Sequence, residues 1–72
     1  MSGYSSLVGK RVELVYRFGI VYLLAVGTLL ADSGEFIFVE QHYGRGSVHL
    51  KIPYHSIVRL NEPNLDPRPA EL

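Results

Sequence analysis

The sequence predicts an all-β protein of five short strands, and three observations carry this prediction. Apolar and polar residues alternate along 10–17 and again along 47–52, which is typical of strands with one buried face. The segment 20–31 is rich in β-branched and aromatic residues, which favour a pleated surface. Residues 32–34 read Asp-Ser-Gly between two apolar runs, and this composition favours a hairpin turn.

The first strand is expected over 10–17, after an N-terminal stretch, 1–6, that we expect to be flexible. Its alternation predicts a buried face formed by three residues, Val12, Leu14 and Tyr16. Gly19 follows, and glycine readily adopts the positive φ that a tight hairpin requires. We therefore expect the chain to reverse at Gly19.

The second strand is expected over 20–31, with a bend at Gly27 because few strands run so far without one. A helix is the alternative, since leucine and alanine are good helix formers, but the β-branched residues and the following turn favour a strand. Residues 20–26 are apolar at every position. Both faces of this segment must be covered, and one small barrel has one interior, so we expect the chain to self-associate.

The remaining strands are expected over 35–42, 47–52 and 57–60. The fourth is predicted to bury Val48, Leu50 and Ile52. Pro53 removes a backbone donor, so we expect a single 3₁₀ turn over 53–56 before the last strand. Five strands, a long bent second strand and this turn predict a strongly bent SH3-like barrel over 7–61. The proline-rich segment 62–72 is expected to be a disordered tail.

Composition and charge exclude several classes of function. Apolar residues form 47% of the 72 residues, while seven basic residues balance seven acidic ones, so no overall field attracts a polyanion. The uncharged run 18–31 is shorter than the roughly 20 residues that span a membrane as a helix. The N-terminus lacks a secretory pattern, which predicts a cytoplasmic location and no membrane association. No nucleophile with a partnered base and no phosphate loop occurs, so we expect neither an enzyme nor a cofactor.

Three segments resemble the Sm-like (LSm) family, which contains the Sm proteins and a bacterial RNA chaperone. They are LVGKRV at 7–12, GTLLAD at 27–32 and IPYHSI at 52–57. The second is similar to a Gly-x-Leu-x-x-x-Asp motif, one residue short. The resemblance implies an Sm-like barrel and a homo-oligomeric ring of six or seven subunits, closed by pairing between the fourth and fifth strands of neighbours. It also implies single-stranded RNA as the ligand.

The candidate RNA-binding residues lie in two turns that this strand order places at one end of the barrel. They are Asp32, Ser33, Gly34, Glu35, Phe36, Tyr54 and His55. In the first turn, the chemistry of a hairpin explains aspartate and glycine equally well. In the second, a ring would bring copies of His55 together around its axis.

Other polar and aromatic residues are given structural interpretations. His42 and His49 lack the short spacing of metal ligands, so no metal site is expected. Aromatic residues with a period of two, such as Phe36 and Phe38, are expected in the core. Arg45 could contact phosphate at a loop tip, but one cation contributes little. Two functions remain open: an Sm-like RNA-binding ring, and an oligomeric or partner-binding barrel with no nucleic-acid role.

Overall fold

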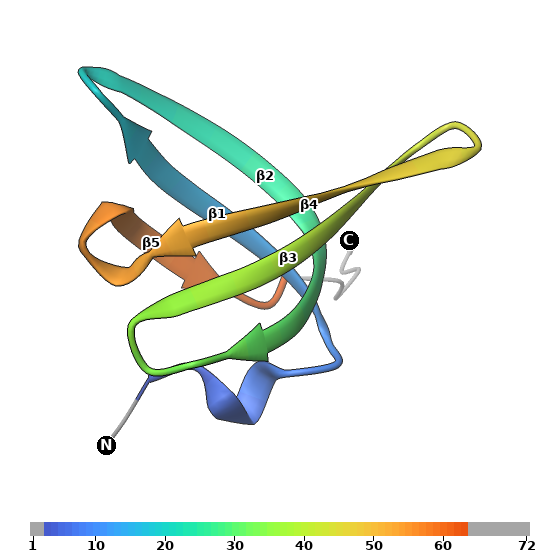
Figure 1. Cartoon of the computed structure of the whole chain (residues 1–72), viewed down its shortest axis with the longest axis horizontal. Helices are drawn as coiled ribbons and strands as arrows, with labels where there is room; N and C mark the ends of the chain where they lie inside the picture. Colours follow the sequence, from blue (N-terminus) through green and yellow to red (C-terminus); the bar gives the residue numbers. More distant parts are fainter. Residues whose placement is uncertain (1–2, 64–72) are drawn as a thin grey trace, which may run out of the picture.

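The computed structural model describes residues 3–63, and they form a curved antiparallel sheet of five strands (Figure 1). The strands are β1 (Arg11–Phe18), β2 (Val21–Asp32), β3 (Phe36–Tyr43), β4 (Gly46–Pro53) and β5 (Ile57–Asn61). Two 3₁₀ helices, η1 (Ser5–Leu7) and η2 (Tyr54–Ser56), precede β1 and join β4 to β5. No α-helix occurs within this range, which confirms the all-β prediction.

Neither 3₁₀ helix in residues 3–63 has the length and apolar character of a membrane-spanning helix. The apolar run 18–31 lies mostly in β2. The predicted tail, 62–72, falls outside the described residues from position 64 onward.

The strands follow the order β4-β3-β2-β1-β5, and all four pairings are antiparallel. Three of these pairings are hairpins between consecutive strands, and β5 returns to the far side of β1. No ladder joins β4 to β5 among residues 3–63, so the sheet has two unpaired edges there. The strand order fits the predicted barrel, and closure of the sheet stays a prediction.

The long strand β2 curves through its middle (Figure 1). Gly27 is buried there, and a Cβ atom at this position would collide with the backbone carbonyl of Glu40 on β3. The irregularity of the ladder lies slightly further on, between Leu29 and Ala31. Glycine is therefore required at position 27 by the close approach of a neighbouring backbone.

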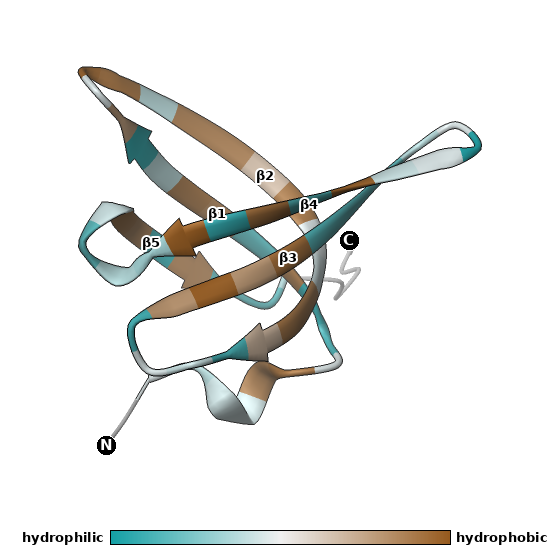
Figure 2. Cartoon of the chain, in the orientation of Figure 1, coloured by the Kyte–Doolittle hydropathy of each residue, from teal (hydrophilic) through white to brown (hydrophobic). Residues whose placement is uncertain are grey.

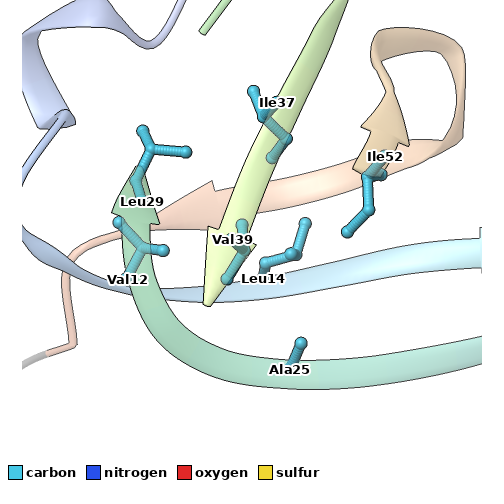
Figure 3. Packing of buried hydrophobic residues seen from close by; sticks show 7 residues of the cluster. All are labelled: Val12, Leu14, Ala25, Leu29, Ile37, Val39 and Ile52. Carbon is cyan, nitrogen blue, oxygen red and sulfur yellow. The ribbon is translucent and has the colours of Figure 1, made fainter. Parts of the chain in front are cut away.

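Seven apolar residues within 3–63 form the buried core, and Figure 3 shows their side chains gathered between the strands. The register of the strands explains why these side chains meet on one face, because Leu14 lies opposite Ala25, and Ile37 lies opposite Ile52. Alternate side chains of paired strands share one face, so one face of the sheet becomes apolar. The members are Val12, Leu14, Ala25, Leu29, Ile37, Val39 and Ile52.

Two predictions about the core were wrong. Phe36 and Phe38 are only half-buried, because they alternate with Ile37 and point to the opposite face of β3. Val48 shares the face of Ile52 but is 44% exposed. It lies toward the tip of the β3–β4 hairpin, which extends beyond the core (Figure 1).

Among residues 3–63, most of the exposed large apolar residues lie in the β1–β2 hairpin, and Figure 2 shows mostly brown, hydrophobic colouring along β2 toward the turn. Ile20 is 91% exposed and Leu24 is 67% exposed. Ala25, the next residue, is buried. The apolar segment 20–26 is thus covered by its own chain only at its inner end, where β2 joins the core.

Candidate functional site

The two predicted turns meet at one end of the sheet. The backbone N–H of Tyr54 donates a hydrogen bond to the carbonyl oxygen of Glu35 at 2.9 Å. The Tyr54 hydroxyl donates to Oδ1 of Asp32 at 2.5 Å. The structure therefore brings η2 and the β2–β3 turn together, as the strand order predicts.

The carboxylate of Asp32 is occupied by three donors of its own chain. Oδ1 accepts from the Tyr54 hydroxyl and from the backbone N–H of Gly34, the latter at 2.9 Å. Oδ2 accepts from the backbone N–H of Tyr4 at 2.7 Å. The hydrogen bond from Tyr54 is the main reason why the pKa of Asp32 is lowered, and the same bond raises the pKa of Tyr54. Asp32 thus links η1, the turn and η2.

Ser33 and Gly34 supply the chemistry of the hairpin. The Ser33 hydroxyl accepts from the backbone N–H groups of Glu35 and Phe36, at 3.3 Å and 3.1 Å. Gly34 has a φ of 94°, a conformation that glycine adopts at little cost. The hairpin interpretation therefore accounts for the contacts of Ser33 and for the bond from Gly34 to Asp32. The bonds that Asp32 accepts from Tyr4 and Tyr54 instead join the turn to other segments.

Phe36 presents a half-buried ring on the outer face of the sheet. Pro53 lies opposite it on β4, and Nζ of Lys51 lies 4.4 Å from the centroid of its ring. A cation at this distance over an aromatic face is held by the ring quadrupole. The sequence placed Phe36 among the candidates and did not identify Lys51 as its partner.

His55 is exposed and lies apart from the Asp32 cluster. Together with Arg17, Gly19 and Ser56 it lines a surface hollow of about 290 Å³. The side chain of Arg17 is oriented by a hydrogen bond from Nε to the carbonyl of Gly19 at 2.9 Å. The two candidate residues of η2 therefore face different surfaces: Tyr54 contacts Asp32, while His55 lies beside the β1–β2 hairpin.

A second hollow of about 300 Å³ is also lined by Arg17, Gly19 and Ser56. Its walls include Tyr16 and Phe18 from β1, and Lys51 and Ile52 from β4. Of the residues that the structure describes, none that lines either hollow is acidic. Sequence reasoning missed Arg17 and Lys51, because the alternation of each strand shows only that these residues lie on the face opposite the buried one. Their place beside the 53–56 turn depends on the tertiary structure.

The histidines of the β3–β4 hairpin gather around one carboxylate. Glu40 lies opposite His49, with 3.3 Å between Oε2 and Nε2, and Oε1 lies 3.7 Å from Nε2 of His42. The contact with His49 is the main reason why the pKa of Glu40 is lowered. No group of three or more histidine, cysteine, aspartate or glutamate residues within 3–63 is arranged to hold a metal ion.

The site offers cations, an imidazole and aromatic faces at the end of a curved sheet. These groups suit contact with an anion or a flat ring. Comparison of the chain with models of protein families, with curated proteins and with solved structures finds no match.

Proposed function

We propose that the chain is a subunit of an Sm-like homo-oligomer, in which β4 of one copy pairs with β5 of the next. The observation that carries this proposal is that β4 and β5 are the two edge strands of a curved sheet, and within residues 3–63 each has one side with no partner strand. An unpaired edge presents backbone N–H and C=O groups that another strand can satisfy. Two different edges make a head-to-tail interface, which closes into a ring when the rotation allows it.

The exposed apolar surface supports association. Burying a side chain the size of Ile20 or Leu24 contributes about 1.5–3 kcal/mol, and both are largely exposed in the single chain. The hollow shared by β1 and β4 supports a closed barrel within each subunit, because these strands are not neighbours in the sheet.

Single-stranded RNA is the ligand that we propose for this assembly, at the surface formed by His55, Arg17 and Lys51. Cations hold phosphates, while aromatic and imidazole rings stack on bases. The cluster around Asp32 is a weaker candidate, because its polar groups are already bonded to one another. The second candidate function is an oligomeric barrel with no nucleic-acid role, which the balanced net charge favours.

Sedimentation velocity at micromolar concentration and about pH 8 tests the assembly. We expect a mass several times that of the 8.1 kDa chain, and a monomer would overturn the proposal. Val58 on β5 is 53% exposed, and a lysine there should disrupt the edge. Val8 is 42% exposed and lies outside every strand, so Val8→Lys is the matched control and should leave the assembly intact.

Fluorescence anisotropy with short uridine-rich and adenine-rich RNA tests the ligand. We expect binding at low salt that weakens as salt is added. Arg17→Gln and His55→Ala should reduce the affinity without changing the sedimenting mass. Arg45→Gln removes one charge from the exposed β3–β4 tip and should have little effect. If the wild-type chain shows no affinity at low salt, the RNA proposal fails and the oligomeric barrel remains.

A further inference from the structure

The two edge strands carry positive and titratable side chains but no acidic residue. On β4 the outer face holds His49 and Lys51, both in register with outward-facing residues of β3. On β5 the same face holds Arg59, which lies opposite Val15 of β1. When a sheet continues across an interface, its faces continue too, so pairing β4 with a neighbour's β5 brings these cations toward one another.

The groups that face His49 come from β3 and from its own strand. Glu40 lies 3.3 Å away across the ladder, and His42 contacts the other oxygen of the same carboxylate at 3.7 Å. Lys51 is two residues along β4. On the other edge, Glu13 and Arg17 share the outer face of β1 with Val15, next to Arg59. Within residues 3–63, Glu40 is the one carboxylate in contact with the two histidines.

Protonation of the histidines changes the net charge of this region. Histidine is the side chain whose ordinary change of charge falls between about pH 5 and 8. Protonating His42 and His49 adds two positive charges to a face on which Lys51 and the neighbour's Arg59 are offset by the carboxylates of Glu40 and the neighbour's Glu13, so this face becomes net positive. Because the pKa of Glu40 is lowered, its carboxylate is already ionised in this range and gains no further negative charge in acid.

We propose that acid weakens the association of this chain, because protonated His42 and His49 on the β3–β4 hairpin repel Arg59 of the neighbouring copy. This inference rests on the proposed pairing of β4 with β5. It assigns Glu40, His42 and His49 a role in regulating association, at the edge through which the subunits would pair.

Sedimentation velocity at about pH 8 and about pH 5 tests the inference, with circular dichroism at both values to follow folding. We expect the dissociation constant to rise at least about tenfold in acid, while the strand signal is retained. Added salt should reverse part of this rise, because it screens exposed charges. The double variant His42→Gln, His49→Gln should stay assembled at about pH 5.

The control is His55→Gln, which removes the other histidine of the chain and should keep the acid response. A monomer at about pH 8 overturns the proposed function itself. An oligomer that is unchanged in acid overturns this inference alone. Dissociation in acid that persists in the double variant, or that accompanies loss of the strand signal, also overturns it.

Discussion

The hydroxyl of Tyr54 donates a hydrogen bond to the carboxylate of Asp32 at 2.5 Å, joining η2 to the end of β2. The ring of Tyr54 also packs edge-to-face against Tyr4, with 5.4 Å between the centroids. Tyr4 in turn donates its backbone N–H to the other oxygen of Asp32. Three segments that are distant in the sequence are therefore tied together at one carboxylate.

Tyr54→Phe is expected to lower the melting temperature by a few degrees, because it removes the hydroxyl and keeps the ring. The loss leaves Asp32 with one donor fewer. Tyr43→Phe is the matched control, since its hydroxyl donates to Oε1 of Gln41 at 3.0 Å in a solvent-exposed hydrogen bond. Thermal unfolding followed by circular dichroism compares the two variants. Equal melting temperatures would contradict a stabilising role for the Tyr54 contact.

The lowered pKa of Asp32 predicts a loss of stability in acid. A carboxyl whose folded pKa lies below its unfolded value stabilises the fold fully above about pH 4, and this contribution disappears as the pH falls through the folded pKa. Urea unfolding between about pH 7 and pH 2 measures the effect. Asp32→Asn should reduce this dependence below about pH 4. A variant whose stability falls as steeply as that of the wild type would refute the assignment.

Gly27→Ala is expected to destabilise the protein by at least about 1–3 kcal/mol, because the new methyl group meets the backbone carbonyl of Glu40. That atom belongs to β3 and cannot move without disturbing the β2–β3 ladder. Gly46 provides the control, since a Cβ there would come no closer than 3.9 Å to the Tyr43 carbonyl. Urea unfolding should show a small change for Gly46→Ala. Similar losses for both variants would argue against the close approach.

Two leucines on neighbouring strands should respond very differently to truncation. Leu14 is 1% exposed, so Leu14→Ala should cost about 2–5 kcal/mol in the free energy of unfolding. Leu24 is 67% exposed, and Leu24→Ala should change the stability of the monomer by no more than about 0.5 kcal/mol. Urea unfolding at two protein concentrations separates monomer stability from association. A large loss for Leu24→Ala that does not depend on concentration would contradict its exposed placement.

Local sequence was sufficient to locate the strands. The predicted segments 10–17, 20–31, 35–42, 47–52 and 57–60 each agree with the observed bounds to within one residue at either end. The reason is that alternation and turn residues act over a few positions, as at Gly19, whose φ is 66°. The expected reversal at this residue is confirmed.

Tertiary structure decided which faces and which side chains meet. Alternation shows that Phe36 and Ile37 lie on opposite faces, but only the curvature of the sheet decides that Ile37 is the one inside. The bond between Asp32 and Tyr54 joins the end of β2 to the start of η2, which pairing and curvature bring together, so no local pattern could predict it. The same holds for Arg17 and His55, which line one hollow although 38 positions separate them along the chain.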